Sequence, residues 1–222
     1  RIGMREIVNK FKNNYSIAII DYGMSNMFSI KNALVTLGFD VKITSNYSTI
    51  LSSDGAILPG VGSFPEAMKN IHNLGLDRAI YDFIATKKKF MGICLGFHLL
   101  FDESNEIVNT QGLGVVAGKV ECFLEGDRSL RVPHVGWSVV KKNESICNKR
   151  ADVPLKNLDR DFFYFVHSCY ASPEKNDDIY TTTKYGDINY CSSILYENIF
   201  ACQFHPEKSG NKGVLIFKNF FN

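Results

Sequence analysis

The sequence predicts an α/β fold in which a mainly parallel central sheet is flanked by helices and extended by antiparallel strands. In the first half, short apolar, β-rich runs alternate with segments of helical periodicity. Beyond about Gln111, strand-like runs follow one another without long helices between them. No Pro/Gly/Ser-rich linker and no internal repeat divides the chain. We therefore expect one domain over residues 16–222, preceded by an N-terminal extension or expression remnant at residues 1–15.

The elements of the first half follow from local patterns. Ser16 to Ile20 (SIAII) is an apolar run that predicts a buried strand. Apolar residues at helical spacing predict a helix from Ser25 to Leu37, and Gly38 suits its end. Ser63 and Glu66 have the spacing of a capping box and predict a helix start. Further strands are expected at 41–44, 55–58 and 90–93, and further helices at 68–71, 76–85 and 95–101.

The second half predicts mainly strands, which we expect to add antiparallel neighbours to the same sheet. A final strand and a final helix close the chain. The expected strands are 112–123, 130–140, 162–166, 181–184, 190–196 and 199–204, and the expected helix is 213–221.

Composition excludes several classes of function. The 222 residues carry 25 basic and 23 acidic side chains, a net charge of +2, which gives no electrostatic reason to expect nucleic acid. No apolar run approaches the roughly 20 residues that cross a bilayer, so no membrane is expected. The N-terminal segment is polar and lacks a secretory pattern, which favours the cytoplasm. The scattered cysteines predict no metal site and are expected to be reduced thiols: Cys94, Cys122, Cys147, Cys169, Cys191 and Cys202.

Cys94 stands at a predicted strand–helix junction. It lies between Gly92 and Gly96 (G-I-C-L-G), the spacing of a nucleophile elbow with cysteine in place of serine. The glycines permit the tight turn that exposes the nucleophile, and the following helix N-terminus favours a thiolate. A buried structural cysteine between packing glycines is the competing interpretation.

His205 and Glu207 end the last predicted strand, in the segment Q-F-H-P-E. Two positions apart in extended chain, their side chains can lie on the same side. Glu207 would then hold one ring nitrogen of His205 while the other deprotonates Cys94. A lone histidine is usually structural, but beside an elbow this pair predicts a Cys-His-Glu triad.

The loop Leu58 to Ser63 (LPGVGS) connects a strand to a helix. Its backbone N–H groups at Gly60, Val61 and Gly62 can bind an oxyanion or a phosphate. The pattern matches neither a dinucleotide fingerprint nor a P-loop.

Together these motifs resemble class I (triad) glutamine amidotransferases, whose fold is flavodoxin-like. The segments D-Y-G-M-x-N, from Asp21, and P-H-x-G-W, from Pro133, are similar to the glutaminase subunits of imidazole glycerol phosphate synthases. The match covers nearly all the chain after about Ser16.

The resemblance implies hydrolysis of L-glutamine through a thioester on Cys94, without metal or other cofactor. Ammonia would pass to a (β/α)₈-barrel cyclase subunit, in a heterodimer of histidine biosynthesis. In this family activity is weak without the partner. The implied oxyanion and substrate residues are Gly60, Val61, Gly62, Leu95, His98, His167 and Ser168. The implied partner-facing residues are Asn26, Pro133, His134, Val135, Gly136, Trp137 and Lys208.

Two residues depart from the family pattern. Ser25 replaces a glycine, and His98 replaces the glutamine of C-L-G-x-Q, which helps to hold substrate. The departures leave open a paralogous glutaminase that supplies ammonia to a sugar amidotransferase of surface-polysaccharide biosynthesis. They also leave open a weakly active scaffolding subunit, and a cysteine peptidase or γ-glutamyl hydrolase would use a similar elbow.

Overall fold

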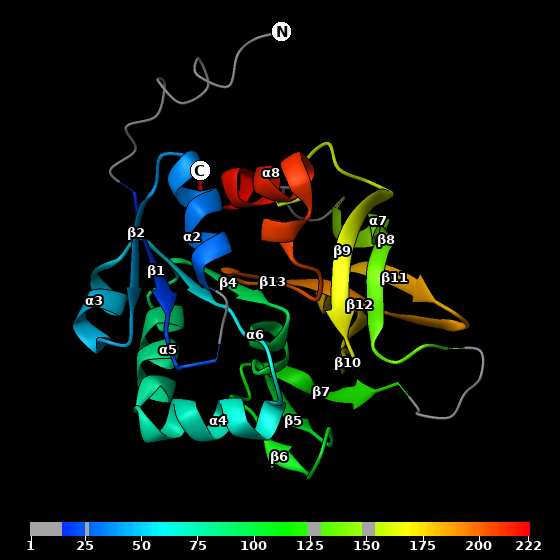
Figure 1. The fold of residues 1–222 in the computed structure, drawn as a ribbon, viewed down its shortest axis with the longest axis horizontal. Helices are drawn as coiled ribbons and strands as arrows, with labels where there is room; N and C mark the ends of the chain where they lie inside the picture. Colours follow the sequence, from blue (N-terminus) through cyan, green and yellow to red (C-terminus); the bar gives the residue numbers. More distant parts are fainter. Residues whose placement is uncertain (1–14, 25–26, 124–129, 148–153) are drawn as a thin grey trace, which may run out of the picture.

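The computed structural model describes residues 15–24, 27–123, 130–147 and 154–222 (Figure 1). Five parallel strands form the centre of the sheet, and each pairs with its neighbour in this order. In spatial order they are β2 (Asp40–Thr44), β1 (Ser16–Ile20), β3 (Gly55–Leu58), β4 (Lys89–Ile93) and β13 (Ile199–Cys202). Their carboxyl ends lie at one edge of the sheet, where ligands bind in α/β folds of this kind.

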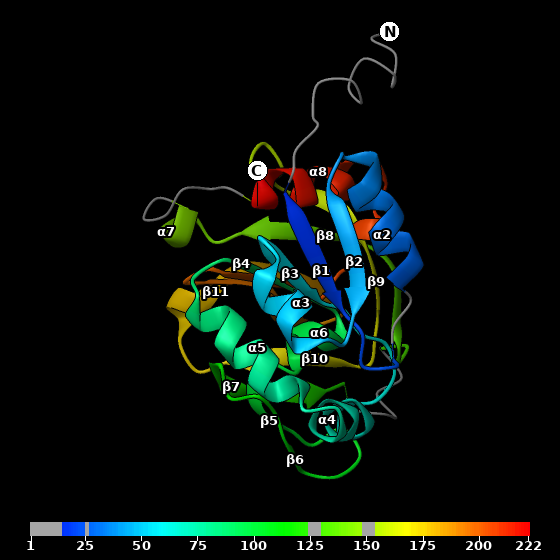
Figure 2. The ribbon, with the colours of Figure 1, turned by 90° about the vertical axis from the view of Figure 1, so that its left-hand side faces the viewer.

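Helices cover both faces of this parallel region (Figure 2). This explains why strands such as β1 are apolar throughout, since alternate side chains enter two different cores. Ala18 and Ile20 face one core, and Ile17 and Ile19 face the other. The helices on one face are α3 (Tyr47–Ser52), α4 (Phe64–Asn73) and α5 (Leu76–Ala85), and those on the other are α2 (Met27–Thr36) and α8 (Gly210–Phe221).

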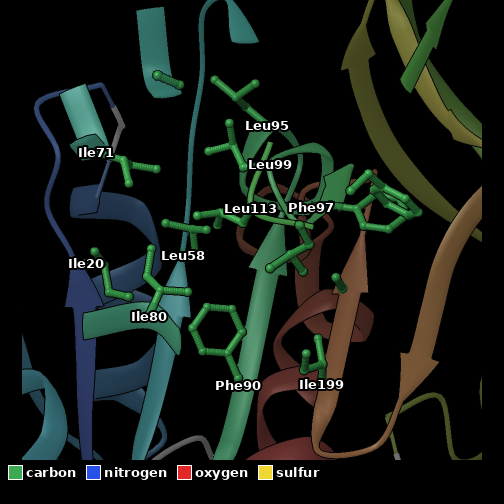
Figure 3. Close-up of a cluster of buried hydrophobic side chains, with 14 of the residues drawn as sticks. Ile20, Leu58, Ile71, Ile80, Phe90, Leu95, Phe97, Leu99, Leu113 and Ile199 are labelled. Carbon is green, nitrogen blue, oxygen red and sulfur yellow. The ribbon is translucent and has the colours of Figure 1, made fainter. Parts of the chain in front are cut away.

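The larger core is packed between the sheet and helices α4 and α5 (Figure 3). Ile71 of α4 and Ile80 of α5 meet Leu58 and Phe90 of the sheet, and all four are fully buried. Burying side chains of this size stabilises the fold by roughly 1.5–3 kcal/mol each. The packing fixes β3 and β4, and therefore the loops that follow them.

Antiparallel strands extend the sheet beyond β13, and β5 and β7 within this extension are parallel to each other. The path continues through β12 (Ile188–Tyr196), β10 (Cys169–Pro173), β7 (Val116–Cys122), β5 (Phe101–Ser104) and β6 (Thr110–Gln111). A branch runs through β11 (Ile179–Tyr185), β8 (His134–Lys142) and β9 (Asp161–His167). The short elements are α6 (Leu95–His98), α7 (Glu144–Cys147), η1 (Asn176–Asp178) and η2 (Pro206–Lys208). The predicted α/β fold, mainly parallel at its centre with an antiparallel extension, is thus confirmed.

Two local expectations were wrong. The helix that begins at Leu95 ends at His98, because the chain then enters β5 and pairs with β6 and β7. Ser63 occupies the N-cap position of α4 but makes no side-chain cap. Instead, the Phe64 N–H donates to the Glu106 carboxylate at 2.6 Å, a bond from a distant loop that the local pattern does not show.

Two cysteines expected to be reduced are joined as a disulfide, Cys122–Cys169. They are direct partners across the antiparallel pair β7–β10, a relation hidden by their wide separation in sequence. Within the described ranges, no helix is both long and apolar enough to span a membrane.

Candidate active site

Cys94 directly follows β4 and sits in a backbone conformation that few side chains adopt, with φ of 53°. Its N–H donates to the Cys202 carbonyl at 2.8 Å, which ties the turn to the neighbouring strand β13. Gly96 must be glycine, because a Cβ there would lie 1.8 Å from the Leu58 carbonyl oxygen. Close packing of β3 against α6 therefore makes the elbow geometry possible, and strain of this kind is typical of functional sites.

His205 reaches Cys94 because their strands are neighbours. β13 pairs with β4 in register Ile93↔Cys202, so the residues after both strands emerge side by side. His205 Nδ1 lies 2.7 Å from Glu207 Oε1, and both side chains are almost completely buried. Because a carboxylate only accepts hydrogen bonds, Nδ1 carries a proton.

The backbone of this segment is also fixed. The His205 N–H donates to the Tyr164 carbonyl at 2.9 Å, and the Ser209 hydroxyl donates to the His205 carbonyl at 2.6 Å. The other ring nitrogen, Nε2, is buried and has no hydrogen-bond partner within the described part of the chain. That nitrogen is therefore available to a reacting group.

The charge of the site follows from its partners. Burial alone would lower the pKa of His205, but the negative charge of Cys94 and the contact with Glu207 outweigh it and raise the pKa to about 10. His205 is therefore an imidazolium at neutral pH when it faces a thiolate. An arrangement of this kind can activate a cysteine nucleophile beside an oriented acid–base partner.

A cavity of about 190 Å³ opens beside the Cys94 sulfur. Six of the residues predicted to bind substrate or oxyanion line it, namely Val61, Gly62, Leu95, His98, His167 and Ser168. Glu106 and Val166 line it as well, and neither is predicted from the sequence. No local pattern indicates Glu106, because the turn after β5 brings it to the cavity.

The glycine loop is in contact with the elbow. A Cβ on Gly60 would lie 2.1 Å from the Tyr22 hydroxyl, so only glycine fits. The Val61 N–H donates to the Met24 carbonyl at 3.0 Å and is therefore not free to bind an oxyanion in this conformation. Gly60 lines a second, much smaller cavity of about 10 Å³, together with His205 and Glu207.

Two histidines of the cavity wall are buried and neutral. Burial lowers the pKa of His98 to about 4, partly opposed by its hydrogen bond to Gln203. Burial also places the pKa of His167 well below its usual value. His167 donates from Nδ1 to the Cys169 carbonyl at 2.7 Å, which leaves its Nε2 as an acceptor facing Tyr190 at 3.2 Å.

The predicted partner-facing residues divide into two groups. Val135 and Trp137 are exposed at 56% and 55%, and Pro133 and Lys208 are also exposed. His134 instead points inward, stacked on Phe165 and Tyr185 and bonded to Ser138. Gly136 is half-buried between these neighbours in the strand, and Asn26 lies outside the described residues.

The residues most exposed on this face form an apolar surface on β8 and β9. Val135, Trp137 and Val139 of β8 are paired across the ladder with Val166, Tyr164 and Phe162 of β9. Lys208 Nζ lies 5.9 Å from the centre of the Tyr164 ring. Val135, Trp137, Val139 and Phe162 are exposed, and Tyr164 and Val166 are half-buried. Exposed apolar patches are typical of interaction surfaces, and we refer to these six residues below as the β8–β9 face.

Comparison with known proteins places this geometry in context. The sequence profile of the family "Glutamine amidotransferase class-I" matches residues 18–222. The imidazole glycerol phosphate synthase subunit HisH of Caldanaerobacter subterraneus subsp. tengcongensis is 42% identical over 205 residues, which are 92% of this chain and 96% of that protein. The HisH subunit of Listeria monocytogenes serotype 4a is 43% identical over 205 residues, with coverages of 92% and 94%. Among solved structures, PurLQS from Thermotoga maritima has a TM-score of 0.69 at 18% sequence identity, and the match covers 95% of this chain and 99% of that one. At this identity the similarity shows a shared fold and nothing more.

Proposed function

This chain belongs to the class I glutamine amidotransferases and, within them, to the family of HisH subunits of imidazole glycerol phosphate synthase, and from that membership we propose its chemistry. It is the glutaminase subunit, which releases ammonia from L-glutamine for imidazole glycerol phosphate formation in histidine biosynthesis. The observation that supports the mechanism best is the strained Cys94 beside the buried His205–Glu207 pair, at the mouth of a cavity of about 190 Å³.

The first half of the reaction is thioester formation. The Cys94 thiolate adds to the carboxamide carbon of glutamine and gives a tetrahedral oxyanion. His205 donates the proton on Nε2 to the departing nitrogen, the C–N bond breaks, and ammonia leaves. Glu207 holds Nδ1 throughout, so Nε2 keeps its direction.

The second half is hydrolysis. Neutral His205 takes a proton from water, the hydroxide adds to the thioester carbon, and the C–S bond breaks to return the Cys94 thiolate. The sum is glutamine plus water giving glutamate plus ammonia. No metal is required, and among the described residues no group of three or more His, Cys, Asp or Glu is placed to hold one.

Two further residues that line the cavity, Glu106 and Ser168, suit the amino-acid end of glutamine. Glu106 supplies the negative charge that an α-ammonium needs, and its position is fixed by the N–H of Phe64. Ser168 supplies a hydroxyl for the α-carboxylate. His98 and His167, both neutral, add polar contacts without adding charge.

The oxyanion donors are incomplete in this conformation. The Leu95 N–H follows the nucleophile directly, but the Val61 N–H is bonded to the Met24 carbonyl. Turning the Val61 peptide toward the cavity would break that bond and add a donor worth about 3 kcal/mol in the transition state. We expect the isolated chain to be weakly active and the partner to favour the turned peptide.

The β8–β9 face is the proposed docking surface for the (β/α)₈-barrel cyclase. Trp137 at its centre is a large, exposed anchor of the kind that dominates interface energies. Val166 of the β8–β9 face also lines the cavity, and its carbonyl oxygen lies 3.9 Å from the Cys94 sulfur. Ammonia released at Cys94 is therefore one strand away from the partner.

The test is glutamate release from glutamine, measured with the chain alone and with a histidine-pathway cyclase and its ribotide ligand, using Cys94→Ala as the control. Strong stimulation that requires Cys94 supports the proposal. Stimulation by a sugar amidotransferase partner, and not by the cyclase, would instead support the paralogue suggested by His98. Absence of glutamate release with either partner would overturn both.

A further inference from the structure

We propose that His98 and Gln203 are positioning residues that stabilise the reactive sulfur of Cys94, with Gln203 donating a hydrogen bond to it and His98 holding the Gln203 amide in place. The inference rests on the proposed function, because it concerns the nucleophile of that reaction.

The three side chains form a buried series. Gln203 is fully buried directly after β13, and its backbone N–H is fixed by the Ser192 carbonyl at 2.9 Å. Its Nε2 lies 3.8 Å from the Cys94 sulfur, and its Oε1 lies 2.6 Å from Nε2 of His98. His98, in α6, is also buried.

The chemistry of a thiolate fixes the direction of both hydrogen bonds. A negative sulfur only accepts, so the Gln203 NH₂ must face it and donate. The amide oxygen then faces His98 and has no hydrogen to give. The proton of His98 must therefore lie on Nε2, from which it donates to that oxygen.

Without His98, the amide would lose this constraint. Gln203 Oε1 would be left buried without a donor, and a flipped amide would point its oxygen at the thiolate. A buried acceptor without a donor is destabilising, because it has lost its hydrogen bonds to water and gained none in return. The family's glutamine at position 98 can donate to the same oxygen, so His98→Gln is a conservative change for this role.

Other titratable groups surround the sulfur from several elements. His205 is the positive charge beside it, and Glu106 lines the same cavity. Burial raises the pKa values of Tyr22 and Cys202 and lowers that of His167, so these three are neutral. All five residues are present in the wild type and in every variant below, so their effects on the Cys94 sulfur cancel when the alkylation rates are compared.

The test is the rate of Cys94 alkylation by iodoacetamide as a function of pH, followed by peptide mass spectrometry. The reagent is small and needs neither glutamine nor a partner, and it reports the thiolate. We expect Gln203→Leu and His98→Leu to slow alkylation about tenfold near neutral pH, the size of a hydrogen bond to a charged group. The rates should converge with the wild type at high pH, and His98→Gln should retain the wild-type profile.

Asn198→Leu is the matched control. It removes the hydrogen bond of a half-buried amide at the opposite end of β13, where Asn198 donates to the Lys88 carbonyl at 2.6 Å. It is expected to lower stability without changing the alkylation profile. Gln203→Met serves if Gln203→Leu does not fold.

Wild-type profiles for the Gln203 and His98→Leu variants would overturn the inference, as would an equal slowing in Asn198→Leu. These outcomes are separate from the glutaminase test. A chain that shows the expected alkylation series but releases no glutamate would refute the proposed function alone.

Discussion

The wild-type protein is expected to lose stability in acid partly because of His98, and replacing His98 by glutamine should make that loss smaller. Burial lowers the pKa of His98 to about 4, whereas an unfolded histidine titrates near about 6.5. Between these values the unfolded chain binds a proton that the native chain does not. Stability contributed by this site is therefore fully present above about pH 6.5 and is lost as the pH falls toward 4.

The size of the effect follows from the two pKa values. At about pH 4.5, protonation of His98 in the unfolded chain should lower the free energy of unfolding of the wild type by roughly 2–3 kcal/mol relative to its value at high pH. At about pH 7.5 the same effect should be almost zero. The assay is urea unfolding of the wild type and His98→Gln at both pH values. The double difference is the wild-type minus variant free energy of unfolding at about pH 7.5, less the same quantity at about pH 4.5. The remaining buried histidines, such as His134 and His167, are present in both proteins and cancel in it.

A double difference near zero would refute the reasoning, because His98 would then titrate equally in the folded and unfolded chains. A double difference of opposite sign would place a positive charge on His98 in the native protein.

Three further variants test the elbow, the triad and the partner surface. Gly96→Ala should destabilise the protein by more than about 2 kcal/mol in urea unfolding, since its Cβ would lie 1.8 Å from the Leu58 carbonyl oxygen; unchanged stability would mean that α6 moves freely against β3. Glu207→Gln should lower kcat for glutamine at least about 100-fold with little change in KM, because His205 loses its orienting carboxylate; a loss confined to KM would contradict this role. Trp137→Ala should weaken binding of the cyclase about 30-fold or more in calorimetry while leaving the fold unchanged; equal affinity would place the interface elsewhere.

The elements around the elbow could be predicted because their signals are local. Gly92 and Gly96 flank Cys94 at the spacing that a sharp strand–helix turn requires, and the structure contains that turn. The membership in the glutamine amidotransferase family, predicted from these segments, is confirmed by the family match and the relatives. The strands β1, β3, β4 and β13 were predictable for the same reason, because burial on both faces makes each one a short, mainly apolar run.

What the sequence could not show depends on long-range pairing. Glu106 reaches the cavity through the β5 turn, and Gln203 meets His98 across 105 positions of the chain. His134 alternates with exposed neighbours in β8, so only the strand's pairing decides that it points inward. Cys122 and Cys169 face each other only once β7 and β10 are paired.

The central claim is that glutamine is cleaved through a thioester on Cys94, and it is tested most directly by trapping that intermediate. The complex with the cyclase would be mixed with glutamine, quenched in acid within the first turnovers, and digested for mass spectrometry. We predict a glutamyl adduct on the Cys94 peptide, absent in Cys94→Ala and absent without glutamine. Glutamate formation with no adduct on Cys94, or with an adduct on another residue, would contradict the claim.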